Sequence, residues 1–298
     1  MTSTRAKVTR TVLKTLSSKK AYDKAEIVKH RKQFERNVST LFPQNKHVNM
    51  QHSEIAGLKV AWIEAKGQAE RTIIYLHGGG FAFGSITGYQ QHMARLAKLC
   101  KAKVLAIDYS LAPEHPYPIA LDEVQRVWQE LIKQGLEASK TAIVGDSAGG
   151  NLAIAAALRF KEAKLPQPAC LVMLSPVLDA TFSGDSYKTK EDKEPFLTMD
   201  KFHFFLEAYL QNHSRKDPFA SPVFADLSGL PPFLTQVGSD ELVLSDSETI
   251  IEHAKRDGVQ GTLNVGDNMW HGWQLFASYV PEAKKDMKVL ADYVISHT

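Results

Sequence analysis

The chain has 298 residues, of which 44% are hydrophobic, 23% charged and 9% aromatic, and its formal net charge is +3. This composition is typical of a globular protein and excludes collagen, coiled coils and low-complexity disorder. A charge so near balance gives no reason to expect nucleic-acid binding by the whole chain. Two cysteines, Cys100 and Cys170, are too few for a disulfide scaffold, and we expect both to be buried thiols.

The first 36 residues differ from the rest in charge. They carry eleven basic and three acidic side chains, a formal charge of +8, so the other 262 residues carry −5. Apolar side chains recur there and just beyond at helical spacings of four and then seven residues: Val8, Val12 and Leu16, followed by Ile27, Phe34 and Leu41. The pattern predicts helices that pack a thin apolar stripe on the body and expose a basic face. Weak contact of that face with an anionic membrane surface is the alternative.

The N-terminus lacks the continuous apolar region of a secretory signal. No stretch approaches the roughly 18 uncharged apolar residues of a membrane span. We therefore expect a cytoplasmic protein without an integral membrane segment.

From about residue 55, short apolar runs alternate with amphipathic segments. We predict strands at residues 58–65, 71–78, 103–109, 141–145, 169–176, 231–238 and 261–267. We predict helices at residues 89–100, 120–135, 148–163, 247–258 and 281–297, the second and fourth ending at a glycine. The alternation indicates an α/β fold whose mostly parallel sheet is covered by helices on both faces.

Residues 180–215 interrupt this alternation. A polar loop is followed by an aromatic-rich helix that contains Phe202, Phe204, Phe205 and Tyr209. We interpret the segment as an insertion that lies over the end of the sheet.

The most informative motif is Gly145-Asp146-Ser147-Ala148-Gly149, between a predicted strand and a predicted helix. It matches G-x-S-x-G, in which a sharp, strained turn lifts a nucleophilic serine clear of the sheet. The helix N-terminus that follows favours developing negative charge. A phosphate-binding loop is disfavoured because no lysine follows. We expect Ser147 to be the nucleophile and Asp146 to be a structural hydrogen-bonding residue.

A second motif, His77-Gly78-Gly79-Gly80-Phe81, directly follows a predicted strand. Acyl transfer needs backbone N–H donors aimed at the position where the carbonyl oxygen becomes negative. We expect Gly79 and Gly80 to supply two of them and Ala148 the third. His77 precedes the serine, and we expect it to hold the glycine loop by hydrogen bonds.

These motifs together resemble the hormone-sensitive-lipase-like esterases of the α/β-hydrolase superfamily. The resemblance runs from about residue 55 to the C-terminus, in family order, on HGGGF (77–81), DYSLAPEHPYP (108–118), GDSAGG (145–150), SPVLD (175–179), SPVFADLSGLPP (221–232) and HGW (271–273). It implies the α/β-hydrolase fold, with a catalytic core and a helical cap over the site. The core would comprise residues 46–179 and 216–298, and the cap residues 1–45 and 180–215.

The order of the triad in this fold is serine, acid, histidine. The histidines after Ser147 are His203, His213, His253, His271 and His297. His271 precedes a glycine in the loop between the last strand and the last helix, from which it can reach across the sheet. We expect His271 to be the base and the other four to be surface or cap residues.

The acid is predicted within Ser239-Asp240-Glu241, at the carboxyl end of the strand 231–238. Neighbouring side chains at a strand end point in opposite directions, so one carboxylate should face the imidazole. The spacing usual in the family, about thirty residues before the histidine, favours Glu241, and the family's commoner use of aspartate keeps Asp240 as the alternative. Asp246 is expected to be the N-cap of the helix 247–258.

The sequence therefore predicts a serine carboxylesterase that hydrolyses short-to-medium acyl esters through an acyl-enzyme. The alternatives are an amidase or deacetylase with the same triad and a non-catalytic binding module of hydrolase fold. No cofactor is needed, and no Cys/His cluster suggests a metal. The expected partner is a small-molecule ester, and the sequence is compatible with a homodimer.

Overall fold

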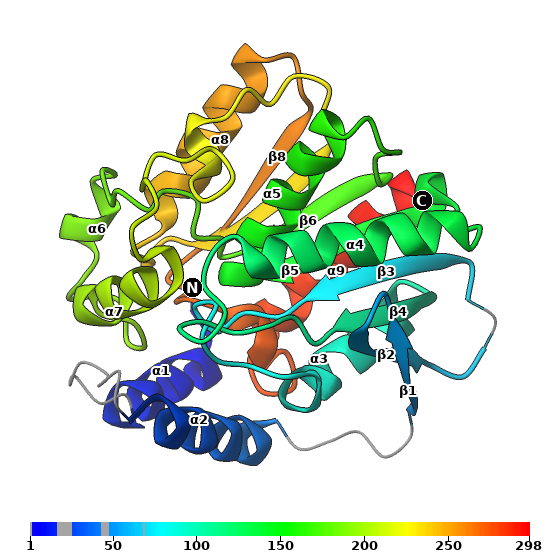
Figure 1. Cartoon of the computed structure of the whole chain (residues 1–298). Coiled ribbons are helices and arrows are strands. Elements are labelled where there is room, and N and C mark those ends of the chain that lie inside the picture. The colour runs from blue at the N-terminus through cyan, green and yellow to red at the C-terminus, as the bar shows by residue number, and fades with distance from the viewer. Residues whose placement is uncertain (1, 17–25, 43–47, 68) are drawn as a thin grey trace.

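The structure, a computed structural model, describes residues 2–16, 26–42, 48–67 and 69–298. Its centre is an eight-stranded sheet in the order β1-β2-β4-β3-β5-β6-β7-β8 (Figure 1). The strands are β1 (Asn49–Ile55), β2 (Leu58–Glu64), β3 (Arg71–Leu76), β4 (Ala102–Ile107), β5 (Thr141–Asp146), β6 (Cys170–Leu174), β7 (Phe233–Gly238) and β8 (Gly261–Gly266). β2 pairs antiparallel with both β1 and β4, and all other pairs are parallel. The predicted α/β fold with a mostly parallel sheet is confirmed.

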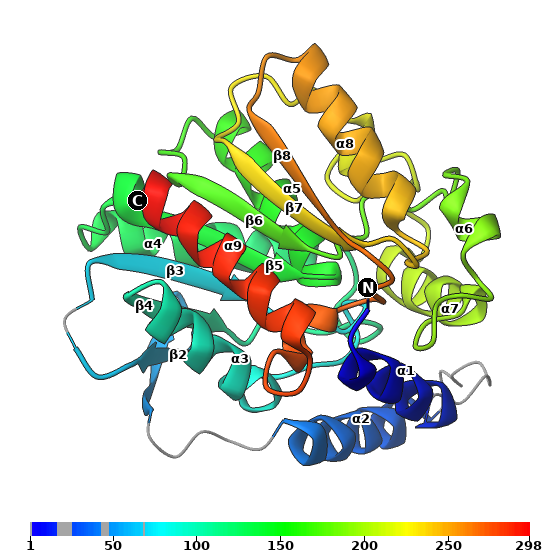
Figure 2. The ribbon, with the colours of Figure 1, turned by 180° about the vertical axis from the view of Figure 1, so that it is seen from behind.

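Helices cover both faces of this sheet. They are α3 (Ile86–Leu99), α4 (Ile119–Lys133), α5 (Ala148–Glu162), α8 (Leu244–Arg256) and α9 (Pro281–His297). α4, α5 and α8 lie on one face, and α3 and α9 on the other (Figures 1 and 2). Side chains of β3 point alternately to the two faces of the sheet. Ile74 and Leu76 pack in the apolar cluster with α4, α5 and α8. Ile73 and Tyr75 pack in the cluster with α3 and α9. Because helices pack on both faces of the sheet, the strands are apolar along their length and do not alternate with polar residues.

Strand β1 was missed by the sequence analysis. Its residues, NMQHSEI, are mostly polar and exposed, except for the half-buried Met50 and the buried Ile55. The strand forms a hairpin with β2 through Ala56 and Gly57, both of which have positive φ, as a two-residue hairpin turn requires. As an edge strand it contributes little to the core, so no hydrophobic pattern marks it.

The predicted apolar stripe of the first helix was wrong. In α1 (Thr4–Leu16), Val8 and Val12 are 57% and 43% exposed, whereas Ala6 and Leu13 are buried. Ala6 and Leu13 are seven residues apart and therefore share a helix face, and the small Ala6 allows close approach to the body. The prediction for α2 (Ile27–Leu41) agrees better, since Ile27 is buried there.

The prediction that Asp246 caps a helix was also wrong. Helix α8 begins two residues before Asp246, with Val243 at its N-cap position. The Asp246 carboxylate is buried and accepts hydrogen bonds from the backbone N–H groups of Leu178 and Asp179 and from the hydroxyl of Tyr187. These donors lie about 60 residues or more away in sequence, so the local pattern did not reveal them.

Four helices lie together beyond the carboxyl ends of the parallel strands (Figures 1 and 2). They are α1, α2, α6 (Ser186–Thr189) and α7 (Met199–Leu210), the last being the aromatic-rich helix of the insertion. Along the described ranges no helix is long and apolar enough to cross a bilayer. Cys100 and Cys170 are buried free thiols, as expected.

Candidate active site

Ser147 stands at the tip of the turn that joins β5 to α5. Its φ of 52° is unusual for a residue with a side chain, and such strain is typical of a nucleophile elbow. A Cβ on Gly145 would lie 2.1 Å from the carbonyl oxygen of Gly149, and one on Gly149 would lie 2.0 Å from that of Leu76. The two glycines of the motif are therefore needed because backbone packs directly on backbone at this turn.

His271 follows β8 and reaches Ser147 across the carboxyl edge of the sheet. Its Nε2 lies 2.9 Å from Ser147 Oγ, and its Nδ1 lies 2.9 Å from Oε2 of Glu241. Because a carboxylate only accepts, Nδ1 carries the proton and Nε2 is free to accept the hydrogen of the serine hydroxyl. The three side chains expected from the sequence thus form one continuous hydrogen-bonded chain.

Glu241 is fully buried and held by further donors. Its Oε1 accepts from the backbone N–H of Gly238 at 2.6 Å and from Ser175 Oγ at 2.8 Å. Ser175 Oγ in turn accepts from the N–H of Gly272, next to the histidine, at 3.1 Å. Ser175 therefore ties the acid and the histidine loop to each other.

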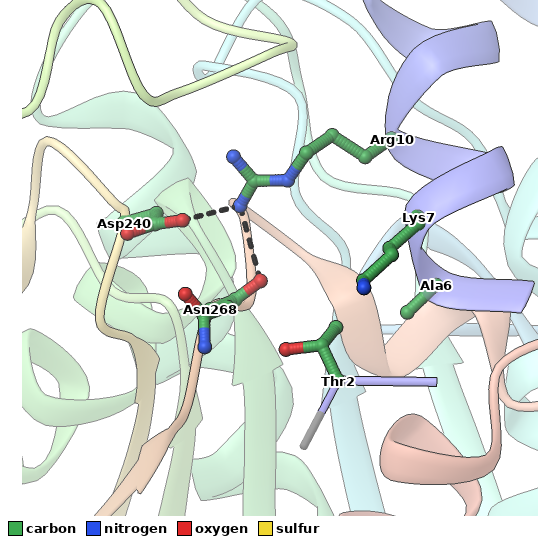
Figure 3. A pocket seen from close by; sticks show the side chains of 6 residues that line it. All are labelled: Thr2, Ala6, Lys7, Arg10, Asp240 and Asn268. Atoms are coloured by element: carbon green, nitrogen blue, oxygen red, sulfur yellow. Dashed lines mark hydrogen bonds and ion pairs between the residues drawn. The ribbon is translucent and has the colours of Figure 1, made fainter. Parts of the chain in front are cut away.

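Asp240 points away from His271. Its Oδ2 accepts a hydrogen bond of 2.5 Å from Nη2 of Arg10 on α1, in a small surface pocket (Figure 3). Arg10 also donates to the carbonyl oxygens of Lys193 at 2.8 Å and Asn268 at 3.0 Å. One guanidinium thus connects the first helix to the residue beside Glu241, to the insertion and to the loop before His271.

A second buried carboxylate, Glu194, approaches His271 from the insertion. Its Oε2 accepts from the backbone N–H of His271 at 2.9 Å, and its Oε1 accepts from that of Phe196 at 2.9 Å. Burial raises the pKa of Glu194 to about 7, the His271 charge opposes this rise, and the charge of Glu241 adds to it.

The imidazole itself is buried among negative charges. Burial alone lowers the pKa of His271, but the hydrogen bond and charge of Glu241, together with the charges of Glu194 and Asp146, raise it above its usual value. The site therefore stabilises the protonated imidazole that a general base must become.

The glycine loop after β3 lies beside the nucleophile turn. Gly78 N–H donates to Oδ1 of Asp146 at 2.9 Å, which connects the loop to the residue before Ser147. Gly79 and Gly80 have φ values of 119° and 61°, which favour glycine. Among the described residues, the backbone N–H groups of Gly79, Gly80 and Ala148 donate to no protein acceptor. They are therefore available to a ligand.

His77 and Asp146 hold this loop, as the sequence suggested. His77 is buried, stacks on Tyr109 with ring centroids 4.3 Å apart, and donates from Nδ1 to the carbonyl oxygen of Gly78 at 2.8 Å. Asp146 also accepts from the hydroxyl of Tyr75 at 2.6 Å, and burial raises its pKa to about 6. Neither side chain hydrogen-bonds to Ser147 Oγ.

The helices beyond the sheet contact the glycine loop directly. The Phe205 ring of α7 lies so close to Gly80 that a Cβ there would be 2.3 Å from it, and Phe205 also packs edge-on against Phe83. From α2, Arg31 donates to the carbonyl oxygens of Ala82 and Ala112 at 2.7 and 2.6 Å. Helices α2 and α7 therefore pack directly against the loop that precedes the nucleophile turn.

The sequence analysis missed Ser175, Glu194 and Arg10. Ser175 begins the SPVLD motif, to which the sequence analysis gave no role. Glu194 ends a charged stretch before Pro195, which the sequence analysis described only as a polar loop. Arg10 was counted only as part of the basic segment. In the described part of the chain, no group of three or more His, Cys, Asp or Glu side chains could hold a metal ion.

Known proteins share this arrangement of elements. A family described by the alpha/beta hydrolase fold matches residues 73–275. An esterase of Acinetobacter venetianus is 37% identical over 257 residues, 86% of this chain and 85% of its own. An acetyl-hydrolase of Streptomyces hygroscopicus is 33% identical over 237 residues, 80% of this chain and 79% of its own. A crystal structure of an esterase from the bacterial hormone-sensitive lipase family has a TM-score of 0.93 at 30% identity, covering 100% of this chain and 99% of its own.

Proposed function

Because this chain belongs to the hormone-sensitive-lipase-like esterases of the α/β-hydrolase family, we propose that it is a serine carboxylesterase acting on short-to-medium acyl esters. The observation that carries the proposal is the hydrogen-bonded chain from Ser147 through His271 to Glu241, with both distances at 2.9 Å. The chain places a nucleophile, a base and an orienting acid in the roles that acyl transfer requires.

Acylation begins when Ser147 Oγ attacks the ester carbonyl carbon and its proton passes to Nε2 of His271. The carbonyl oxygen becomes an oxyanion, which the N–H groups of Gly79, Gly80 and Ala148 bind. The C–O bond to the alcohol then breaks, and His271 gives its proton to the leaving oxygen. The acyl group remains on Ser147 as an ester.

Deacylation repeats these steps with water. His271 takes a proton from water as the water oxygen attacks the acyl carbon, and the same N–H groups bind the second oxyanion. When the bond to Ser147 Oγ breaks, His271 returns the proton to the serine and the carboxylic acid leaves. Glu241 keeps the proton on Nδ1 in both halves and stabilises the imidazolium.

We assign the helical segments to a cap over this site and the remainder to the catalytic core. The cap comprises residues 1–45 and 180–215, and the core residues 46–179 and 216–298; residues 1, 17–25 and 43–47 lie outside the described residues. The contacts of Phe205 with Gly80 and of Arg31 with Ala82 support a cap that limits the room above the glycine loop. That limit, and the acetyl-hydrolase relative, favour short acyl groups.

A series of p-nitrophenyl esters, from acetate to dodecanoate, tests the proposal together with a fluorophosphonate probe of reactive serines. We expect hydrolysis that peaks at short chains and stoichiometric labelling of Ser147. Ser147→Ala should abolish both while keeping the thermal unfolding profile of the wild type. If the wild-type protein hydrolysed none of the esters and was not labelled, the proposal would be overturned. The non-catalytic binding module would then be the remaining alternative.

Matched ester and amide substrates with one acyl group test the nearer alternative, an amidase. Amide cleavage requires protonation of a much poorer leaving group, so we expect the ester to be hydrolysed faster by orders of magnitude. Comparable rates on both would favour the amidase or deacetylase function with the same three residues.

A further inference from the structure

Two carboxylates approach His271 from different parts of the chain. Glu241, from the turn after β7, contacts the imidazole Nδ1, and Glu194, from the insertion, contacts the backbone N–H of the same residue. Both are buried, and the mechanism above uses only the first. A buried carboxylate is costly unless it is hydrogen-bonded, so its presence beside the base calls for a reason.

The two oxygens of Glu194 do different things. Oε1 accepts from Phe196 N–H, which closes the insertion loop on itself, and Oε2 accepts from His271 N–H, 77 residues further along the chain. The hydrogen bond to His271 fixes the backbone from which the imidazole extends. A shift of that backbone would change the distances of Nε2 to Ser147 and of Nδ1 to Glu241 together.

We propose that Glu194 is a positioning residue for His271: its carboxylate fixes the histidine backbone and adds a second negative charge that stabilises the imidazolium. The inference rests on the proposed function, because it assumes that His271 is the base. It also implies that the insertion contributes to the chemistry and does more than cover the site.

The neighbours of Glu194 support an electrostatic contribution. The charged and titratable groups that act on it or on its histidine are His271 in the loop after β8, Glu241 in the turn after β7, Lys201 on α7, and Asp146, the residue before Ser147. The charges of Glu241 and Asp146 act on His271 in the same direction as that of Glu194. Glu194 is mostly ionised only above its pKa of about 7, and there its replacement by a neutral residue should lower the pKa of His271 while Glu241 still holds Nδ1.

The loop that carries Glu194 is itself secured. Arg10 donates to the carbonyl oxygen of Lys193, the preceding residue, and the same guanidinium binds Asp240 beside Glu241. Arg10 thus binds the residue next to each of the two glutamates that contact His271. This arrangement explains why a carboxylate of the insertion can keep a constant position relative to the sheet.

The test is the pH dependence of kcat and kcat/KM for Glu194→Gln on the p-nitrophenyl ester that the wild type hydrolyses best. The amide is nearly isosteric and carries no charge, and its single oxygen can still accept from His271 N–H, although its NH2 group can then no longer accept from Phe196 N–H. Glu194→Asp keeps the charge and shortens the reach. Glu123→Gln is the matched control, since Glu123 is another buried glutamate that accepts from a backbone N–H, that of Ser110 at 2.7 Å.

We expect Glu194→Gln to lower kcat by about tenfold, the scale of one hydrogen bond to a charged group. The acidic limb of its kcat/KM profile should move to lower pH by about half a unit to one unit, because the removed negative charge no longer favours protonated His271. Titration of 15N-labelled histidine by NMR should show the same downward shift of the His271 pKa. Glu194→Asp should restore the position of the limb, and Glu123→Gln should leave it unmoved.

A wild-type acidic limb in Glu194→Gln would overturn the proposal even if kcat fell, because a purely structural contact has that signature. If Glu194→Gln does not fold, Glu194→Asp decides: its shorter side chain should lose the hydrogen bond to His271 N–H and lower kcat, so an unchanged kcat in that variant would overturn the proposal. Ser147→Ala, assayed in parallel, distinguishes a failure of the proposed function from a failure of the role of Glu194. Residual hydrolysis by Ser147→Ala would contradict the proposed function. An inactive Ser147→Ala together with a wild-type pH profile for Glu194→Gln would contradict only the role of Glu194.

Discussion

The turns at the carboxyl edge of the sheet and the helices beyond them hold the same site by different contacts. At the turns, backbone packs on backbone, so that Gly145 and Gly149 leave no room for one added carbon. The helices reach the site through long side chains instead: Arg10 and Arg31 donate to backbone carbonyl oxygens, and Glu194 accepts from a backbone N–H.

The difference bears on how each region responds to change. A backbone contact at van der Waals distance cannot lengthen without moving a strand, because protein interiors are close-packed. A hydrogen bond made by a long side chain can be replaced by water at modest cost when it lies near the surface. We therefore expect substitutions at the turns to abolish activity and substitutions in the helices to change it by degrees.

The largest effect is expected at the nucleophile turn. Gly149→Ala would place a methyl group 2.0 Å from the carbonyl oxygen of Leu76 and should destabilise the protein by about 3 kcal/mol or more, with loss of ester hydrolysis. Urea unfolding and hydrolysis of a p-nitrophenyl ester measure both. Gly135→Ala is the control, since nothing lies within 4 Å of its added carbon; its positive φ should cost only about 1 kcal/mol. Full activity in Gly149→Ala would contradict the expectation that the nucleophile turn tolerates no added carbon.

The next effect distinguishes the two adjacent acids. Glu241→Gln replaces a carboxylate that only accepts by an amide whose NH2 group can donate to Nδ1 of His271. The histidine proton would then lie on Nε2, and this wrong tautomer typically lowers kcat by about 10³–10⁴-fold. Asp240→Asn should change kcat by about twofold at most, because its side chain contacts Arg10 and not the imidazole. Steady-state kinetics at pH 8 measure both. The reverse order of effects would identify Asp240 as the acid.

A graded effect is expected from the first helix. Arg10→Met removes the hydrogen bonds to Asp240, Lys193 and Asn268, and should lower kcat/KM about three- to tenfold, with a small change in melting temperature. Arg5→Met, on the exposed side of the same helix, removes the same charge and serves as the control. Equal losses in the two variants would mean that net charge matters and the contact does not.

The smallest effect concerns substrate length. Phe205→Leu should relieve the packing on Gly80 and raise the ratio of kcat/KM for octanoate to acetate esters by about threefold, the scale of one or two side-chain carbons in an apolar pocket. Its neighbour Phe204 is buried in the cluster of Ile27, Ala82 and Phe83, and the atoms nearest to Gly80 belong to Phe205, so Phe204→Leu is the control. A change of stability without a change of the ratio would show that Phe205 packs but does not select.

Much of the fold, and several residues of the candidate site, could be predicted from the sequence. The strand–turn–helix setting of Ser147 and the glycine loop were recognisable because their requirements, positive φ and close backbone approach, are local. His271 followed from chain order. The sequence left Asp240 and Glu241 open, since alternation says only that they diverge. The hydrogen bond from His271 to Glu241 and that from Arg10 to Asp240 distinguish the two.

The sequence by itself determined strands β2 to β8, the helices that cover the sheet and the two glycine motifs, because periodicity and backbone conformation depend on residues a few positions apart. It misjudged the buried face of α1, where Ala6 and Leu13 pack inward, and it did not reveal Glu194 or Arg10. Only the tertiary structure decided these, since their partners lie 77 and 230 residues away. Which polar group is buried, and against which donor, depends on the surfaces that meet when the chain folds, and a local pattern contains no information about them.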